Sequence, residues 1–225
     1  MTGGAVGIRI AESFLSAGTN VALVFRNASR KKSVDENFAR FPHSFLSINV
    51  DLSDHGAANQ ATAATKARFG SVDFLLNALG GWLGGKKLHE HTNDELDEML
   101  SMDLVPTFNI MAAVIPVMVE QHFGRIVNFI SLQVFGTGKG NSVYVASKSA
   151  VLALTKAAAE EYKNSGIAVY AVAPLTIDTE SNRKGMPGAD TSKWVTIDEI
   201  VDSLFFLCGA GDSSNGTVIK FPGKL

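Results

Sequence analysis

The stretch TGGAVGIRIAESFLSAGTNVALVF, residues 2–25, joins a glycine-dense turn to a helix and then to a strand. Ile8, Ala11 and Leu15 recur at near-helical spacing, which predicts a helix over residues 6–17. The following NVALVF, residues 20–25, is rich in Val and Leu and is typical of a buried strand. A glycine turn that opens a helix lets the backbone approach a pyrophosphate, whose charge then lies at the helix N-terminus. A flexible, glycine-rich start is the alternative interpretation.

The same alternation of strand and helix continues along the chain. Apolar runs of strand length occupy residues 43–50, 72–79, 125–131, 167–174 and 216–221. Helical patterns separate them at residues 54–69, 93–122, 142–163 and 196–208. Strands that are apolar on both faces and separated by helices indicate a parallel sheet covered on both sides. The sequence therefore predicts an α/β fold, a Rossmann-like doubly wound parallel sheet flanked by helices, in one dinucleotide-binding catalytic domain over residues 1–225.

The strand that should precede the glycine turn is missing, because the chain reaches Gly3 directly after its first two residues. In a doubly wound sheet this strand is central, so its loss would leave two strand edges unpaired and two apolar faces uncovered. Either translation begins further upstream, or the chain is shortened, or the protein fills this position in another way. We therefore expect a doubly wound sheet that lacks its first strand.

One long segment, LTIDTESNRKGMPGADTSKW at residues 175–194, shows no regular pattern. A loop of this length in a compact domain is usually functional and often covers a substrate. We predict a substrate loop or lid at about residues 175–195.

Composition excludes several classes of protein. With 225 residues, 46% hydrophobic and 19% charged, the chain has the balance of a globular domain. Its formal net charge of −2 gives no reason to expect nucleic acid as a partner. Cys208 is the single cysteine, which excludes an intramolecular disulfide and favours a reducing, cytoplasmic setting. No apolar run reaches the roughly 18 residues of a membrane span, and the start lacks the pattern of a secretory signal. HEH at residues 89–91 offers too few ligands for zinc, so no metal site is expected.

A candidate reacting pair lies in GNSVYVASKSA, residues 140–150. Tyr144 and Lys148 are four residues apart, so on a helix they share one face. Free tyrosine has a pKa of about 10, and a nearby ammonium lowers this value towards the range in which a phenol exchanges protons efficiently. On this spacing alone, an exposed helix pair is the commoner explanation. Ser131, at the end of the strand predicted at 125–131, can hold a substrate oxygen where an open α/β sheet binds ligands, and this favours a catalytic trio.

The end of the strand at residues 20–25 bears on the choice of cofactor. In a dinucleotide fold this point contacts the adenosine ribose, and an acidic residue there binds the 2′-hydroxyl of NAD. Here Phe25 is followed by Arg26, and an arginine matches a 2′-phosphate. We predict NADPH as the cofactor, with NADH the weaker candidate, and a solvated loop charge as the alternative role of Arg26.

Together, the glycine turn, the strand order and YVASK resemble the short-chain dehydrogenase/reductase family, over essentially the whole chain. TGGAVG resembles its T-G-x-x-x-G turn, VDL at 50–52 its adenine-contacting aspartate, and DFLLNALGG its D-x-L-V-N-N-A-G stretch. The resemblance implies a catalytic trio of Ser131, Tyr144 and Lys148. It implies a cofactor site formed by Gly3, Gly4, Gly7, Arg26, Asp51, Asn77, Gly80, Tyr144, Lys148, Pro174, Thr176 and Thr179.

Some loops resemble one branch of that family, the dihydropteridine reductases. GGWLGG at 80–85 is similar to that branch's Gly-Gly-Trp segment, and residues 174–194 to its Pro-x-Thr-x-Asp-Thr loop. Trp82 and Trp194 could then flank a flat heteroaromatic substrate, although anchoring of the loops is an equal alternative. Ser131 and Arg26 differ from what that branch would have.

Asp103 falls where the family has an asparagine, and Arg9 where it typically has a glycine. For an aspartate at such a position, a solvated or capping carboxylate is a more common role than a catalytic one.

These observations predict an NADPH-dependent oxidoreductase that reduces a carbonyl or a quinonoid dihydropterin-like small molecule, with Tyr144 as the proton donor. The alternative is a catalytically impaired nucleotide-binding sensor or scaffold with the same fold, for which the missing strand and Asp103 are the motives. The resemblance also implies a homodimer or homotetramer, because in this family helices equivalent to residues 93–122 and 142–163 usually pack between subunits.

Overall fold

A computed structural model describes residues 4–136 and 138–224, so Gly3 of the predicted cofactor site lies outside the described residues. The strands are β1 (Val21–Phe25), β2 (Phe45–Asn49), β3 (Phe74–Asn77), β4 (Gly124–Phe129), β5 (Ile167–Pro174) and β6 (Val218–Phe221). The helices are α1 (Ala5–Ser16), α2 (Lys31–Asn37), α3 (His55–Phe69), α4 (Asn93–Glu120), α5 (Ser142–Glu161), α6 (Glu180–Gly185) and α7 (Ile197–Gly209). Short 3₁₀ turns include Leu132–Phe135, after β4, and Thr191–Lys193, after α6.

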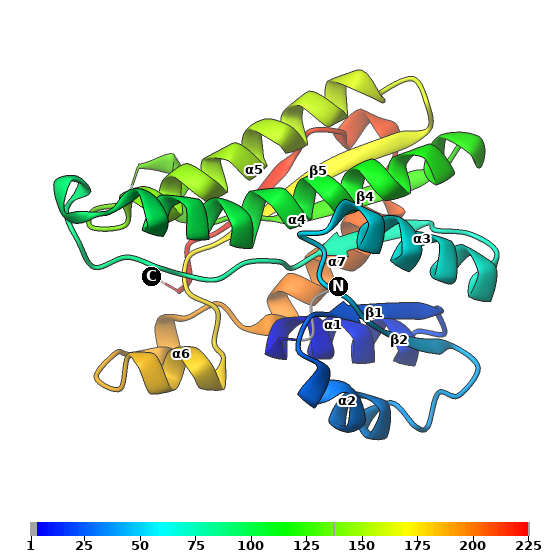
Figure 1. The fold of residues 1–225 in the computed structure, drawn as a ribbon, viewed down its shortest axis with the longest axis horizontal. Helices are drawn as coiled ribbons and strands as arrows, with labels where there is room; N and C mark the ends of the chain where they lie inside the picture. The colour runs from blue at the N-terminus through cyan, green and yellow to red at the C-terminus, as the bar shows by residue number, and fades with distance from the viewer. Residues whose placement is uncertain (1–3, 137, 225) are drawn as a thin grey trace.

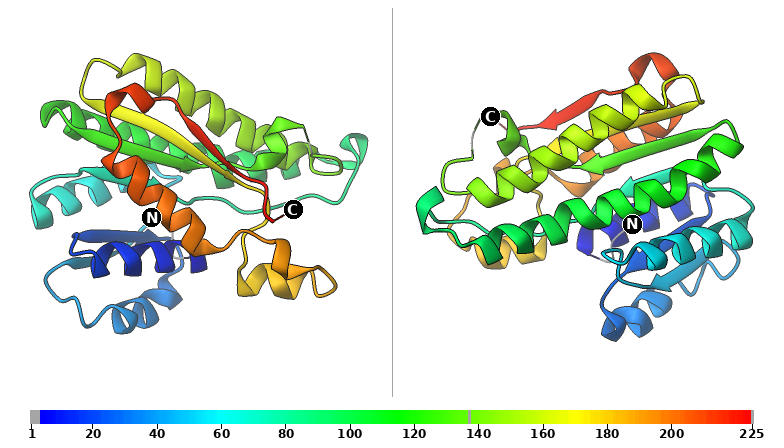
Figure 2. Two further views of the ribbon diagram at one scale, coloured as in Figure 1. Left: turned by 180° about the vertical axis from the view of Figure 1, so that it is seen from behind. Right: turned by 45° about the horizontal axis from the view of Figure 1, so that its top comes forward.

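The strands form two parallel sheets, one of order β1-β2 and one of order β3-β4-β5-β6. Helices α3, α4 and α5 cover one side of the strands, and α1 and α7 cover the other, as the three views show (Figures 1 and 2). This is the predicted doubly wound α/β arrangement, and the prediction of the fold class is confirmed. β5 forms where every residue of IAVYAVAP is buried, because this strand has neighbours on both edges and helices on both faces.

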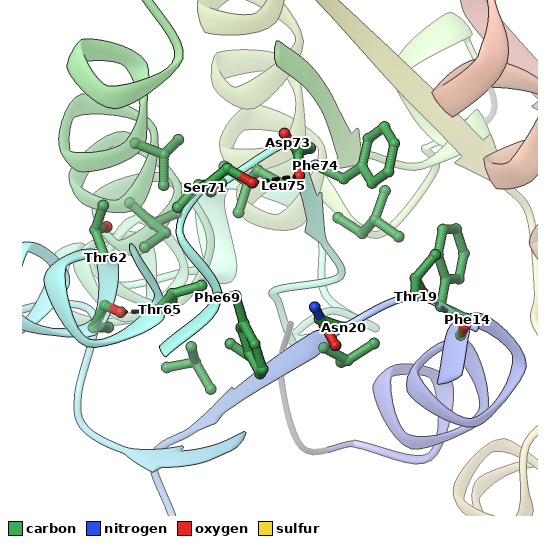
Figure 3. A pocket seen from close by; sticks show the side chains of 18 of the residues that line it. Phe14, Thr19, Asn20, Thr62, Thr65, Phe69, Ser71, Asp73, Phe74 and Leu75 are labelled. Carbon is green, nitrogen blue, oxygen red and sulfur yellow. Dashed lines mark hydrogen bonds between the residues drawn. The ribbon is translucent and has the colours of Figure 1, made fainter. Parts of the chain in front are cut away.

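A cavity of about 330 Å³ separates the two sheets and lies between β1 and β3 (Figure 3). Residues 20–22 and 24 line one side and residues 73–76 the other. In β1, the Val21 amide donates to Ser44 and the Phe25 carbonyl accepts from Val50, so this alternate set of backbone groups faces β2. Ala22 and Val24 therefore direct their backbone N–H and C=O groups the other way, towards the cavity. The expected gap in the middle of the sheet is present in the described residues.

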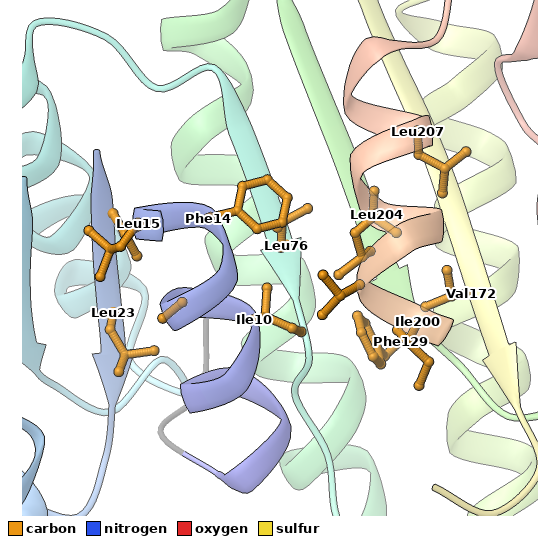
Figure 4. Packing of buried hydrophobic residues seen from close by; sticks show 14 of the residues in the cluster. Ile10, Phe14, Leu15, Leu23, Leu76, Phe129, Val172, Ile200, Leu204 and Leu207 are labelled. Atoms are coloured by element: carbon orange, nitrogen blue, oxygen red, sulfur yellow. The ribbon is translucent and has the colours of Figure 1, made fainter. Parts of the chain in front are cut away.

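Helix packing holds the two sheets together across this cavity. On one side, Ile10 and Phe14 of α1 belong to the same apolar cluster as Leu76 of β3 and Leu204 of α7 (Figure 4). The rings of Phe14 and Phe205 stack at 4.3 Å between centroids. On the other side, Val24 of β1 belongs to the cluster that α3 and α4 form with the four-stranded sheet. Contacts through the helices thus replace direct strand pairing at this point.

Helix α4 begins with a capping box, in which the Thr92 hydroxyl accepts from the Glu95 amide and the Glu95 carboxylate accepts from the Thr92 amide. Among the described residues it is the one helix long and apolar enough to cross a membrane. More than half of its apolar window is buried inside the protein, where α4 packs against α3, α5, β3 and β4. Its apolar character therefore has a source in the core of the domain.

The segment at 175–195 contains more regular structure than its sequence pattern predicts. It holds α6 and the 3₁₀ turn Thr191–Lys193, each of which begins at a side chain that caps the backbone. Thr179 accepts from the Asn182 amide, and Asp190 accepts from the Ser192 amide. Short helices with such caps form without an apolar periodicity, which explains why the pattern missed them.

Candidate active site

Three predicted catalytic side chains meet at the carboxyl end of β4. Ser131 lies directly beyond the strand and caps the following 3₁₀ turn, with its Oγ accepting from the Gln133 amide at 3.3 Å. Tyr144 and Lys148 lie one turn apart on α5, whose N-terminal half packs against that turn. Ser131 and Lys148 are buried and Tyr144 is half-buried. The spacing in sequence and the topology of the sheet thus bring the three together.

The Tyr144 hydroxyl lies in an environment that keeps it protonated. Burial raises the pKa of Tyr144 above its ordinary value, and the negative charge of Asp103 raises it further. A hydrogen bond with Ser131 opposes both effects. The sequence analysis expected Lys148 to lower this pKa. The expectation is wrong for the arrangement seen here, because the ammonium is engaged with other groups.

The Lys148 ammonium has three oxygen partners. Its Nζ donates to the Leu79 carbonyl at 3.0 Å and to the Phe129 carbonyl at 3.3 Å, at the ends of β3 and β4. Asp103 Oδ1 lies 3.3 Å from the same nitrogen. Burial lowers the pKa of Lys148, and Asp103 opposes that shift. The three contacts match the three N–H groups of an ammonium.

Asp103 is fully buried, so the expectation of a solvated or capping carboxylate is wrong. It projects from α4, and its Oδ2 accepts from the Ser147 hydroxyl at 2.5 Å. Its Oδ1 accepts from the Gly81 amide at 3.3 Å. The carboxylate therefore receives hydrogen bonds from α5 and from the loop after β3 in addition to the ion pair with Lys148.

Gly80 makes this arrangement possible. Its φ of 135° lies in a region that residues with a Cβ rarely adopt. A Cβ at this position would overlap both Lys148 Nζ and Asp103 Oδ1. The glycine predicted to contact cofactor thus also leaves room for the ion pair.

Four of the predicted cofactor residues line a second cavity, of about 240 Å³, at the carboxyl ends of β1 and β2: Gly4, Arg26, Asp51 and Gly80. Arg26 is exposed and lies near enough to Asp51 for its charge to lower the pKa of that carboxyl, although hydrogen bonds from Ser53 contribute more. Gly4 is the N-cap of α1, has no capping side chain, and has open space where a Cβ would be. The first-turn amides of α1 are therefore uncapped by side chains at the edge of this cavity.

The other predicted cofactor residues are more dispersed. Gly7 is buried in the first turns of α1. Asn77 is buried, and its amide nitrogen donates to Thr107 at 3.0 Å and to Asn128 at 3.1 Å, so this side chain joins β3 to α4 and β4. Pro174 ends β5, Thr176 accepts from the Val195 amide through its carbonyl, and Thr179 caps α6. These three follow β5 at the carboxyl edge of the sheet.

The two tryptophans differ in their surroundings. Trp82 is 62% exposed, and its indole N–H donates to Asn141, three residues before Tyr144, at 3.2 Å. Trp194 is only 8% exposed, because the adjoining Val195 bridges to Ile177 and draws the ring into the protein. Among the described residues no ring contact joins the two, so the expected flanking pair is not formed in this arrangement.

Sequence reasoning missed Ser147 and Asn141. Ser147 precedes Lys148 and lies three residues after Tyr144, so its place on the same helical turn was readable from the spacing. Asn141 links Trp82 to Gln133, to which its side-chain amide donates at 3.0 Å. Nothing in the local pattern indicates that link.

Known proteins show the same pattern of sequence and fold. The family described as short chain dehydrogenase matches residues 1–188. A 2-(R)-hydroxypropyl-CoM dehydrogenase of Xanthobacter autotrophicus is 31% identical over 216 residues, which cover 90% of this chain and 86% of that protein. An uncharacterized oxidoreductase of Staphylococcus aureus is 27% identical over 79% of this chain and 75% of its own length.

Solved structures share the fold. The structure titled ElxO with NADP bound superimposes with a TM-score of 0.89 at 24% identity, covering 96% of this chain and 92% of that chain. An NAD⁺-bound xylitol dehydrogenase gives a TM-score of 0.89 at 22% identity, over 99% of this chain and 96% of that one. None of these names is a dihydropteridine reductase, so the resemblance to that branch stays a prediction.

Proposed function

The chain belongs to the short-chain dehydrogenase family and is an oxidoreductase of that family, and on this premise we propose that it is an NADPH-dependent reductase of a small carbonyl compound. The observation that carries the proposal is the meeting of Ser131, Tyr144 and Lys148 at the end of β4. The cavity with Gly4, Arg26 and Asp51 lies at the same carboxyl edge of the strands, where open α/β sheets bind dinucleotides.

The residues present suit a nicotinamide dinucleotide. The uncapped N-terminus of α1 offers backbone N–H groups to a pyrophosphate. Asp51 would accept from the adenine, and the exposed guanidinium of Arg26 would pair with a 2′-phosphate. The named structures bind NADP in one case and NAD⁺ in another, so the preference for NADPH rests on Arg26.

Bound NADPH would supply the hydride for reduction. On the protein side, the Ser131 hydroxyl donates a hydrogen bond to the substrate carbonyl oxygen. Tyr144, held protonated by its buried site, gives its phenolic proton to that oxygen as the C=O π electron pair moves onto it. Lys148 contacts a cofactor ribose only if it exchanges one of its three present oxygen partners.

A dihydropterin-like ring is a second candidate substrate, and Trp82 is the observation that favours it. Its indole is exposed and is fixed by Asn141 near the start of the helix that carries Tyr144. A fixed aromatic face of this kind can stack on a flat heterocycle. Quinonoid dihydropterin therefore belongs in the substrate panel beside simple ketones and aldehydes.

We also propose that the protein forms a homodimer or homotetramer. Val105, Phe108 and Val119 of α4 present apolar surface, and Phe108 is 53% exposed. Light scattering tests this proposal, and a monomer at working concentration contradicts it.

The test of function is the consumption of NADPH with the substrate panel, by the wild-type chain and by Tyr144→Phe. The substitution removes the proton donor, so turnover should fall by about 10²–10⁴ while NADPH binding is retained. Tyr162→Phe is the matched control, because Tyr162 lies just beyond the far end of the same helix. Unchanged turnover in Tyr144→Phe would refute the assigned role. NADPH binding by wild type without reduction of any substrate would favour a catalytically impaired nucleotide-binding sensor or scaffold.

A further inference from the structure

The ion pair between Asp103 and Lys148 is the feature that the proposed chemistry does not use. Asp103 has no exposed surface, and the Lys148 side chain is 6% exposed, so both charges are removed from water. Buried charges of this kind persist when each finds opposite charge and hydrogen bonds. Here the carboxylate has Ser147 and the Gly81 amide as further partners, and the ammonium has the carbonyls of Leu79 and Phe129.

The two charges are arranged unevenly with respect to Tyr144. Lys148 Nζ is bonded to strand ends and to the carboxylate, and no hydrogen bond to the Tyr144 hydroxyl is among its described contacts. Asp103, in contrast, acts on Tyr144 as a negative charge. The carboxylate also reaches the helical turn of Tyr144 through Ser147, whose hydroxyl lies 2.9 Å from the Tyr144 carbonyl.

We propose that Asp103 is a positioning residue that fixes the Lys148 ammonium against the ends of β3 and β4 and takes up its charge, so that Tyr144 stays a protonated donor. This inference rests on the proposed function for its meaning, but the arrangement can be tested without turnover. It makes the site suited to reduction, in which Tyr144 gives a proton to the substrate oxygen. Oxidation of an alcohol needs the phenolate instead, which forms only at higher pH.

The sign of the pH dependence follows from the groups that face Tyr144. On its own helix these are Ser147 and Lys148, from α4 Asp103, and from the end of β4 Ser131. Among the described residues, Asp103 is the only charged group that shifts the pKa of Tyr144 or of Lys148. Removal of its negative charge must therefore favour the phenolate and lower the pKa of Tyr144.

The direct experiment is a pH titration of ¹³C-labelled tyrosine by NMR, in wild type, Asp103→Asn and Asp97→Asn. The chain has three tyrosines, and Tyr144→Phe assigns the relevant signal. Asn has nearly the size of Asp and keeps an oxygen for the Gly81 amide. The Tyr144 midpoint should fall by about one unit or more in Asp103→Asn. It should not move in Asp97→Asn, which makes the same change at an exposed position of α4. An unchanged or higher midpoint in Asp103→Asn would overturn the proposal.

A second variant covers the case in which Asp103→Asn does not fold. In Lys148→Met the carboxylate is left without its counter-charge, so the Tyr144 midpoint should rise above that of wild type, and a fall or no change would contradict the proposal. The titrations need neither cofactor nor substrate, so a failure of the proposed function leaves them interpretable. If wild type turns over, Asp103→Asn should shift the pH profile of alcohol oxidation to lower pH by the same interval, whereas a merely structural role would lower the rate at all pH values alike.

Discussion

The four-stranded sheet and the two-stranded sheet hold different parts of the candidate site and are supported differently. In the larger sheet, every residue of β4 and β5 is buried, and both strands have a neighbour on each edge. In the smaller sheet, every residue of β2 is only half-buried, and β1 faces a cavity on one edge. Ser131, Tyr144 and Lys148 belong to the better-supported sheet and its helix α5. Arg26 and Asp51 follow the strands of the weaker one.

The comparison shows how one site can join regions of unequal rigidity. The groups that would transfer a proton depend on fixed distances, and they lie where strands are paired on both sides. The groups that would bind the adenosine end lie on β1 and β2, which reach the rest of the protein through α1, α3 and the side chains between them. A dinucleotide that contacts both sheets would stabilise their relative position by binding the native state alone.

The largest expected difference is in the hydrogen exchange of backbone amides. Val169 and Val172 lie in the middle of the larger sheet, and their amides should exchange only by global unfolding. The amides of Ala22 and Val24 point towards the cavity and should exchange about a thousandfold faster or more, because local opening exposes them. Exchange measured by NMR at single-residue resolution checks this ratio.

Leu23 provides the control within the same strand, because its amide faces β2. It should be protected more strongly than Ala22 and Val24 on either side of it. Equal protection at all three positions would mean that the edge of β1 is covered, and the contrast between the two sheets would then be lost.

The sequence predicted the larger sheet well because its strands are apolar on both faces. The prediction of a strand at 167–174 coincides with β5, since each of its residues enters the core. The prediction at 72–79 is too long, because β3 ends at Asn77 and the Leu79 carbonyl turns to Lys148. Helix α2 was missed because Val34 is its single buried residue, which gives no periodicity.

For the candidate site, local spacing was informative and distant pairing was not. Tyr144 and Lys148 could be placed on one helical face from four residues of sequence. The ion pair of Lys148 with Asp103 depends on how α4 packs against α5, and no local pattern encodes that packing. The gap between β1 and β3 was predictable because a doubly wound fold needs a strand there, whereas the stacking of Phe14 on Phe205 beside it was not.

An intermediate effect is expected at Arg26, the cofactor-selecting candidate on the weaker sheet. Arg26→Gln removes a charge-assisted contact, so NADPH affinity should fall by about 10–100-fold while NADH affinity is unchanged. Fluorescence titration with each cofactor measures both. Lys32→Gln, in the neighbouring α2, removes an exposed positive charge outside the cavity lining and should leave both affinities alone. If NADPH binding weakens equally in both variants, general attraction and not a specific contact would explain it.

The smallest effect should come from the exposed ion pair that links α1 to α7 beside the cavity. Arg9 Nε lies 2.9 Å from Asp198 Oδ1, with side chains 44% and 68% exposed. Solvent screens such a pair, so a double-mutant cycle of Arg9→Ala and Asp198→Ala should give a coupling of about 0.2–1 kcal/mol in the free energy of unfolding. Added salt should reduce it further. Urea unfolding at low and high salt measures the coupling. A larger coupling that persists in salt would mean that charge, and not the apolar contact of Phe14 with Phe205, holds α1 to α7 where β1 and β3 are unpaired.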